Sequence, residues 1–259
     1  MKELKNSVHK TFAILEHFTI DKPAWGVTEL AKEIGSNKST VFRFLAQLHS
    51  IGILDKDAET EKYSLGLKLF ELGNRVQLRR ALVEKTHPKL ASVAMNITET
   101  VHIAVLNKHQ VFYIDKVESP QGLKTSSHIG SYNPAYCTAL GKVLLAFLPA
   151  EQQGAALDFI FDEAGTTAFT KMTITDRPRL LQELAKVRAE KYALDLEELE
   201  EGLICIAIPI FNQQQEVVAS LSASGPASRF REDKVKGYLT MLSEGALAIQ
   251  ERIGNYSIL

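Results

Sequence analysis

The chain has 259 residues, of which 45% are hydrophobic and 24% charged, and its formal net charge is −1. These values are typical of a globular protein with one large or two smaller domains. No apolar run approaches the roughly 18 residues of a membrane span, and the N-terminus MKELKNSVHK lacks the apolar core of a signal peptide, so we expect a cytoplasmic protein.

The cysteines and the charge balance give little indication of function. Cys137 and Cys205 lie far apart and form no CxxC pair, so we expect two buried thiols and no disulfide framework. A nearly neutral chain does not by itself indicate a nucleic-acid partner. A local basic face is sufficient for DNA binding, however, so the question depends on individual segments.

Short helices open the chain. Apolar residues recur at helical spacing over residues 7–18 and predict a helix packed on a core. The next stretch, PAWGVTELAKEIGS, predicts a short helix capped by Thr28 and ended by Gly35 in the left-handed conformation. Ser36 or Asn37 can then cap a further helix after only a few residues. Two short helices joined by a tight turn predict a helix-turn-helix.

The helix that begins after Asn37 has two different faces. At 100° per residue, its apolar residues fall on one side and its hydroxyl, basic and amide residues on the other. A solvated surface helix has the same pattern, so this helix alone leaves both interpretations open. The polar side consists of Ser39, Thr40, Arg43 and Gln47.

The segment after this helix favours a DNA-binding domain. Its sequence, GILDKDAETEKYSLG, predicts two short strands, Ile51 to Leu54 and Lys62 to Leu65, around a charged turn. Helix, turn, helix and hairpin in this order predict a winged helix-turn-helix over residues 1–68, with base contacts from Arg43 and Gln47. The predicted DNA-binding residues are Thr28, Ser36, Asn37, Lys38, Ser39, Thr40, Arg43, Gln47 and Lys62.

A helix is then expected to join two domains. Residues 69–86 are rich in arginine and lysine and show no strand pattern before Pro88, which predicts a basic amphipathic linker helix. The same helix is a candidate dimer seam. Its expected apolar contacts are Leu67, Phe70, Val76 and Leu82.

Residues 87–259 predict a second domain of the α+β class, with helices on an antiparallel sheet. Its first two strands should surround a turn at Lys108 and His109, and Pro149 and Asp176 mark the end of one helix and the start of another. The expected strands are 100–107, 110–117, 123–130, 202–211 and 216–224, and the expected helices are 138–148, 176–193 and 231–254.

The hairpin expected over residues 202–224 has one bulky face and one small face. Isoleucines alternate with Cys205 and small residues in its first strand, and Ser222 and Ser224 alternate with apolar residues in its second. Small polar groups on a sheet face predict a pocket for a small polar molecule, although a solvent-facing strand is the alternative. The acidic stretch DLEELEEG is expected to form a solvated loop, from which Asp195 can fold over the pocket.

The start of the expected helix over 138–148 is a candidate second wall of that pocket. A helix N-terminus offers unpaired N–H groups and positive potential, which suit a carboxylate, and Thr138 can cap it.

Enzyme motifs are missing from the sequence. Gly141 and Lys142 do not complete a P-loop, because Tyr136 and Val143 occupy the positions that require glycine and a hydroxyl residue. GxSxG, HExxH and GxGxxG are absent. We therefore expect no enzyme, cofactor or metal. A nucleophile pair or a zinc site remains an alternative without support from spacing; it would draw on Cys137, Cys205, His102, His109 and His128.

Four stretches in order resemble the IclR family of bacterial transcriptional regulators: VTELAKEIGSNKSTVFRFLAQLHSIGIL, EKYSLGLKLFELG, NPAYCTALGKVLLA and EEGLICIAIPIFN with SLSASGP. The last three are most similar to the branch that represses the 2-keto-3-deoxygluconate regulon of pectin and uronate catabolism. Many relatives carry a histidine and a smaller residue where this chain has Tyr136 and Leu140.

The resemblance implies a winged helix-turn-helix, a linker helix and a GAF-like effector domain, in dimers or dimers of dimers on a palindromic operator. It also implies a small carboxylate effector, either 2-keto-3-deoxygluconate or another such as pyruvate, glyoxylate or an aromatic acid. Activation, turnover of the ligand and DNA binding without an effector stay open. The effector-binding residues it implies are Thr125, Ser127, Ala139, Leu140, Asp195, Leu203, Cys205, Ser222 and Ser224.

Overall fold

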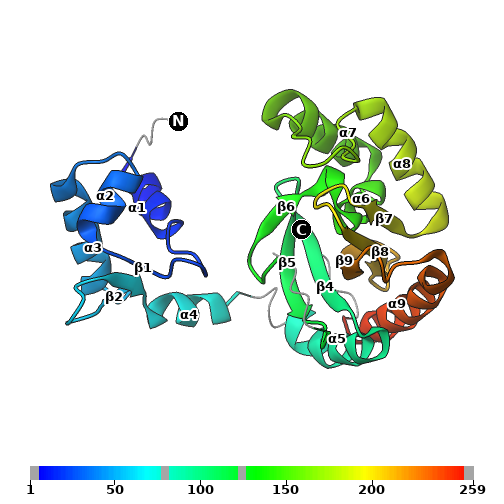
Figure 1. Ribbon diagram of the computed structural model, residues 1–259, viewed down its shortest axis with the longest axis horizontal. Coiled ribbons are helices and arrows are strands. Elements are labelled where there is room, and N and C mark those ends of the chain that lie inside the picture. The colour runs from blue at the N-terminus through cyan, green and yellow to red at the C-terminus, as the bar shows by residue number, and fades with distance from the viewer. Residues whose placement is uncertain (1–5, 77–81, 122–126, 254–259) are drawn as a thin grey trace. The chain divides into compact units, whose positions relative to one another are not determined.

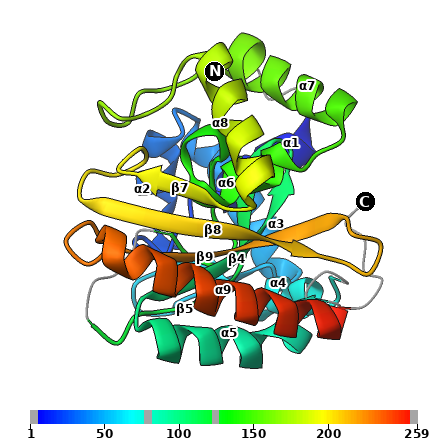
Figure 2. The same cartoon turned by 90° about the vertical axis from the view of Figure 1, so that its right-hand side faces the viewer.

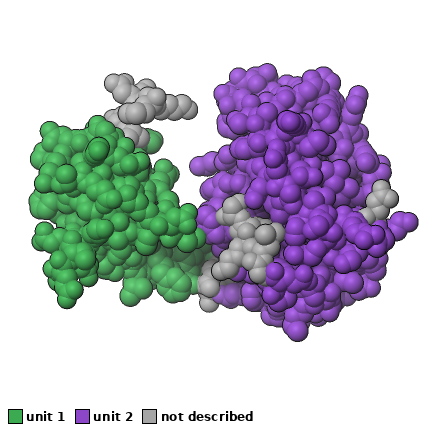
Figure 3. All heavy atoms as spheres, viewed as in Figure 1, with its two compact units in different colours: residues 1–77 green, residues 78–259 purple. Residues whose placement is uncertain are grey.

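A computed structural model describes residues 6–76, 82–121 and 127–253. The chain divides into two compact units, residues 1–77 and 78–259 (Figure 3). The boundary between them falls inside the segment 69–86 that was predicted to join two domains.

The first unit is a winged helix-turn-helix, as predicted (Figure 1). Its strands form an antiparallel sheet in the order β1-β3-β2. One apolar cluster, which includes Leu30, Leu45 and Leu54, packs the helices on this sheet. The elements are α1 (Ser7–Leu15), β1 (Ala24–Trp25), α2 (Val27–Glu33), α3 (Lys38–Ser50), β2 (Leu54–Lys56), β3 (Tyr63–Leu65) and α4 (Leu67–Asn74).

The caps of the helix-turn-helix partly match the prediction. Asn37 caps α3, since its side chain accepts a hydrogen bond from the Ser39 N–H at 3.2 Å, and Gly35 has a positive φ of 62°. The prediction that Thr28 caps α2 was wrong. The helix begins at Val27, because the extended backbone of Gly26 provides the cap position and its N–H donates to the Glu29 carboxylate at 3.4 Å.

The first strand of the wing was also misplaced. Ile51 is the C-cap residue of α3, and Gly52 reverses the chain with a φ of 75°. The strand therefore starts at Leu54, where the chain pairs with β3, and not at Ile51. The C-cap of α3 and the turn after it occupy residues 51–53, which apolar patterning assigned to a strand.

The predicted linker segment begins in α4 and ends in α5 (Glu84–Ile97), and residues 77–81 lie outside the described part. Leu67 and Phe70 are exposed on α4, and so is Val76 just after it, whereas Leu82 is fully buried in the second unit.

The second unit is an α+β domain, as predicted. Its six-stranded sheet is antiparallel throughout, in the order β6-β5-β4-β9-β8-β7. After α5, its elements are β4 (Thr100–Asn107), β5 (Gln110–Val117), β6 (Tyr132–Pro134), the turn η2 (Ala135–Cys137), α6 (Ala139–Ala146), α7 (Ala150–Asp158), η3 (Phe159–Ala164), α8 (Arg177–Glu190), β7 (Ala193–Leu196), β8 (Leu203–Phe211), β9 (Val217–Pro226) and α9 (Glu232–Ile253).

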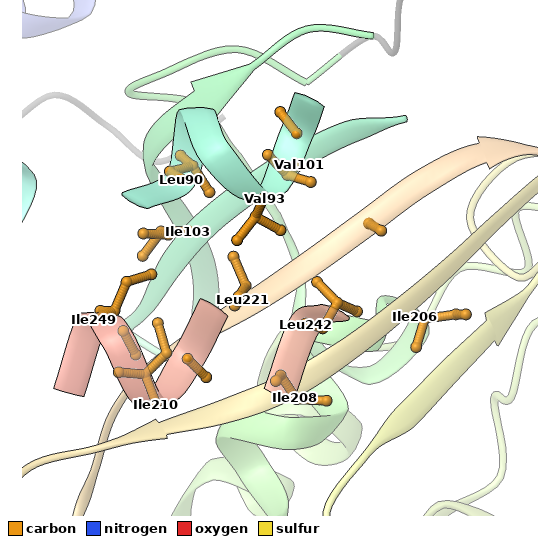
Figure 4. Packing of buried hydrophobic residues seen from close by; sticks show 14 of the residues in the cluster. Leu90, Val93, Val101, Ile103, Ile206, Ile208, Ile210, Leu221, Leu242 and Ile249 are labelled. Atoms are coloured by element: carbon orange, nitrogen blue, oxygen red, sulfur yellow. The ribbon is translucent and has the colours of Figure 1, made fainter. Parts of the chain in front are cut away.

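Helices cover both faces of this sheet. Figure 2 shows α5 and α9 on one face and α6, α7 and α8 on the other. The bulky residues of β4, β8 and β9 pack against α5 and α9 in the larger core, around Leu221 and Ile208 (Figure 4). The opposite face carries small residues such as Ala104 and Ala207 and packs against α6. The predicted two-faced hairpin is confirmed, because Cys205 pairs with Ser224.

Several local predictions hold in this unit. Lys108 and His109 both have positive φ, at 49° and 64°, which is the two-residue turn expected between β4 and β5. Thr138 caps α6 and Asp176 caps α8.

Other predictions in this unit fail. No strand covers Ser127–Gly130, and the remainder of the strand predicted over 123–130 lies outside the described residues. β6 and α7 were not predicted from the sequence. The acidic stretch predicted as a loop begins inside β7, because pairing of Asp195 with Cys205 extends the sheet by one edge strand. None of the described helices is long and apolar enough to cross a membrane.

Candidate functional site

The first candidate site is the exposed side of α3 and its surroundings. Val41, Leu45 and Leu48 are buried, which turns Arg43 and Gln47 to the outside. The helix contains no acidic residue. Of the predicted DNA-binding residues, only Thr40 is half-buried; Thr28, Ser36, Asn37, Lys38, Ser39, Arg43, Gln47 and Lys62 are exposed.

A groove of about 790 Å³ runs between the starts of α2 and α3 and the wing. Thr28, Asn37, Lys38 and Ser39 line it, together with the exposed ring of Phe42, which the sequence analysis did not single out. Ser36 and Thr40 instead line a separate groove beside α1. The predicted residues are therefore divided between the outward side of α3, two grooves at its start, and the wing, where Lys62 precedes β3.

The second candidate site is a cavity between α6 and the small-residue face of the sheet. It is narrow, about 30 Å³, and every predicted effector residue that the structure describes lines it. Thr125 lies outside the described residues. The predicted residues on the wall are Ser127, Ala139, Leu140, Asp195, Leu203, Cys205, Ser222 and Ser224, and the others are His102, Tyr113, Asn133, Thr138 and Leu199.

The N-terminus of α6 forms one wall of this cavity. Thr138 Oγ1 accepts a hydrogen bond from the Gly141 N–H at 3.1 Å, and Ala139 and Leu140 supply the first two amides of the helix. Such amides have no partner within their own helix. Gly141 lets the helix approach the preceding turn, since a Cβ at this position would collide with the Ala135 carbonyl. The wall therefore has positive potential and donors suited to an anion.

Asp195 also lines this cavity, as a buried carboxyl group that is 2% exposed. Burial raises the pKa of Asp195 to about 7, the Glu198 charge adds to this effect, and Lys142 opposes it. The side chain accepts a hydrogen bond from the Glu198 N–H at 2.7 Å, which holds it in place. At neutral pH this group can therefore gain or lose a proton, depending on the charge beside it.

A buried ion pair supports the segment just after β7, which carries Glu198. Lys142 on α6 is 1% exposed and pairs with Glu198, and Glu183 on α8 lies 3.8 Å from the lysine ammonium. This pair was not predicted from the sequence. A lysine within the apolar run TALGKVLLAFL was the available signal, because lysine is seldom buried without a partner.

The sheet contributes polar groups in register. His102 on β4 stands opposite Ser222 on β9, and Ser224 stands opposite Cys205 on β8. From the sequence, His102 was a candidate only as the partner of a cysteine nucleophile or as a zinc ligand. Its role as a cavity residue depends on the pairing of β4 with β9, which no local pattern reveals.

The chemistry of the cavity does not favour a cysteine nucleophile. Burial raises the pKa of the Cys205 thiol and lowers the pKa of His102 to about 3, so a thiolate and imidazolium pair is disfavoured in both members. Burial likewise raises the pKa of Cys137. Among the described residues, no three His, Cys, Asp or Glu side chains are grouped in a way that could hold a metal ion.

Comparisons with known proteins agree with the division into two units. The family model for the IclR helix-turn-helix domain matches residues 7–58, and the model for the bacterial transcriptional regulator IclR C-terminal domain matches residues 75–251.

The chain is also similar to individual proteins of this family. It is 38% identical to the HTH-type transcriptional regulator KdgR of Escherichia coli over 96% of this chain and 93% of that protein. It is 38% identical to KdgR of Dickeya chrysanthemi over 96% of this chain and 80% of that protein. The crystal structure of Thermotoga maritima IclR superimposes with a TM-score of 0.77 at 31% identity, over 96% of this chain and 99% of that one.

These relatives are transcriptional regulators and not enzymes. A family model matches well over half of the chain, and the order of domains in the matches is that of the two units. The chain therefore belongs to the IclR family and is a DNA-binding transcriptional regulator.

Proposed function

We propose that this regulator represses genes of 2-keto-3-deoxygluconate catabolism and that this keto acid releases it from its operator. The observation that carries the proposal is the cavity that combines the N-terminus of α6 with small polar side chains. Similarity to KdgR from two organisms supports the choice of effector.

The cavity suits a keto acid by its chemistry. The carboxylate of the ligand accepts hydrogen bonds from the N–H groups of Ala139 and Leu140, where the helix dipole adds positive potential. Asp195, Ser222 and Ser224 then bind its keto and hydroxyl oxygens. These side chains offer both donors and acceptors, since the Asp195 carboxyl has a pKa near neutrality.

The small size of the cavity gives the ligand a means of control. A six-carbon acid is larger than the space of about 30 Å³, so its binding requires the cavity to widen. The ligand acts through its unequal affinity for the closed and widened arrangements, only one of which binds DNA well. A coupling free energy of about 1–3 kcal/mol is typical of such control.

The DNA contacts are provided by the first unit. Arg43 and Gln47 read base edges in the major groove, while Lys38, Ser39 and Lys62 contact phosphates. The regulator binds a palindromic operator as a homodimer or a dimer of dimers. Leu67 and Phe70, which are 80% and 69% exposed on α4, support a contact between copies of the chain.

Fluorescence anisotropy on DNA from the protein's own upstream region tests the proposal. The titration is done at one fixed salt concentration, because phosphate contacts make affinity salt-dependent. We expect 2-keto-3-deoxygluconate to release the DNA, and pyruvate, glyoxylate and 4-hydroxybenzoate to leave it bound. Release of the DNA by one of those three acids instead refutes the proposed effector. Tight DNA binding that none of the four acids weakens refutes effector control by this class of acid.

A further inference from the structure

His102 is a cavity residue whose ring is held on two sides. It lies on β4, is 2% exposed, and its Nε2 is 2.8 Å from the Ser127 Oγ. Tyr113 packs edge-on against the imidazole with ring centroids 5.3 Å apart, and Asn133 in turn donates to the Tyr113 hydroxyl. These contacts fix the orientation of the ring and use one of its two nitrogens.

The other ring nitrogen of His102, Nδ1, and the hydroxyl group of Ser222 are both buried without a hydrogen-bond partner within the described part of the chain. Both residues line the cavity, and they stand directly opposite each other in the pairing of β4 with β9. Buried polar groups are nearly always paired in folded proteins, so two such groups in one cavity indicate a ligand that completes them.

The kind of group that completes them is determined by charge. Burial and, to a smaller extent, the charge of Lys116 hold the pKa of His102 at about 3, so the imidazole is neutral at physiological pH. A neutral imidazole nitrogen donates in one tautomer and accepts in the other, and a serine hydroxyl does both. A ligand hydroxyl matches either arrangement, whereas a carboxylate gains no charge pairing here.

This pair and Asp195 reach the same cavity from different strands of the sheet. Asp195 on β7 pairs with Cys205, and the strands continue through β9 to His102 on β4. The backbones of Asp195 and His102 are thus three strand spacings apart, about 14 Å at the usual spacing, while both side chains reach the one cavity.

We propose that His102 and Ser222 together bind a hydroxyl group of the effector, and so select hydroxylated acids over acids of the same length without hydroxyls. The inference rests on the proposed function, because it assumes that this cavity is the effector site. It adds a specificity-determining residue, His102, and the part of the ligand that it reads.

Two six-carbon acids separate hydroxyl recognition from carboxylate recognition. 2-Keto-3-deoxygluconate and 2-ketohexanoate share the carboxylate, the keto group and the chain length, and only the first has hydroxyls. Isothermal titration of the full chain is expected to show at least about tenfold tighter binding of the hydroxylated acid, as the pairing of two buried polar groups suggests.

The variants are chosen by which ring nitrogen they replace. His102→Gln places its amide near the position of Nε2 and loses Nδ1, whereas His102→Asn places its amide near Nδ1. We expect His102→Gln and Ser222→Ala each to reduce the preference about five- to tenfold, with His102→Asn retaining more of it than His102→Gln. Ser220→Ala is the matched control, because Ser220 is buried on the same face of β9 but donates to the Ile208 carbonyl at 3.0 Å.

Each outcome has one meaning. A wild-type protein that binds both acids equally, or His102→Gln and Ser222→Ala variants that keep the full preference, refute the hydroxyl reading while the proposed function stands. A folded wild-type protein that binds neither acid refutes the proposed function, and this inference with it. Circular dichroism checks the fold of every variant, and Ser222→Ala carries the test if the substitutions at His102 prevent folding.

Discussion

Replacement of Asp195 by asparagine should remove a pH dependence of stability. Burial raises the pKa of Asp195 from 3.8 to about 7, so the folded state holds its proton more tightly than the unfolded chain does. The resulting stabilisation is complete below about pH 4 and is lost as the pH rises through 7. A shift of about 3 pKa units corresponds to about 4 kcal/mol of unfolding free energy across this window.

The asparagine variant isolates the charge from the packing. Its Oδ1 can still accept the hydrogen bond from the Glu198 N–H, while the side chain no longer ionises. We therefore expect the wild-type protein to lose about 4 kcal/mol more than Asp195→Asn between pH 4 and pH 8.

Urea unfolding at a series of pH values measures this difference. The chain's single tryptophan, Trp25, lies in the first unit, so its fluorescence follows that unit and far-ultraviolet circular dichroism follows both. The pH effect on the free energy of unfolding should appear only in the unfolding transition of the second unit, which circular dichroism follows and tryptophan fluorescence does not. Equal pH dependence in Asp195→Asn and the wild type, or the same change in the exposed control Glu151→Gln, refutes the reasoning.

Three further predictions concern other parts of the structure. Lys142→Met leaves the Glu198 carboxylate buried without its cation and should lower the free energy of urea unfolding by about 3–5 kcal/mol. The double variant Lys142→Met with Glu198→Leu should recover most of that stability. Equal stability of the single and double variants contradicts this prediction. Gly141→Ala should weaken effector binding by displacing the start of α6, which calorimetry detects, and unchanged affinity contradicts the close approach. Arg43→Ala should cost about 1–3 kcal/mol of operator-binding free energy and relax the sequence preference at one base pair. Lys38→Ala should instead weaken binding to all sequences and lower the slope of log affinity against log salt concentration by about 1. Fluorescence anisotropy on mutated operators distinguishes the two effects.

Elements with a strong local pattern were predictable from the sequence. The alternation in β8 and β9 indicated their two faces, and the caps Asn37, Thr138 and Asp176 marked helix starts correctly. β7 was not predictable, because its acidic residues resemble a loop and only its pairing with β8 makes it a strand. Thr28 was misread for a related reason, since a glycine outside the apolar pattern caps α2.

The effector cavity was predictable in part. The small face of the hairpin and the start of α6 have signals in the sequence, and both lie on the wall. His102 and Tyr113 have no such signal in the sequence, because each belongs to an ordinary apolar strand. They join the cavity only where β4, β5 and β9 meet. Glu198 was hidden in an acidic stretch where four neighbouring carboxylates left no means to single it out.

The strand order also determines when the protein can fold during synthesis. β4 lies between β5 and β9 in the sheet. Its pairing with β9 joins residues that are more than a hundred positions apart in the chain. The first unit contains all its partners within residues 1–77 and can form as soon as these leave the ribosome. The second unit must wait for β9 and α9, because they complete its larger core. A translating ribosome therefore carries a finished DNA-binding domain before the domain that controls it exists.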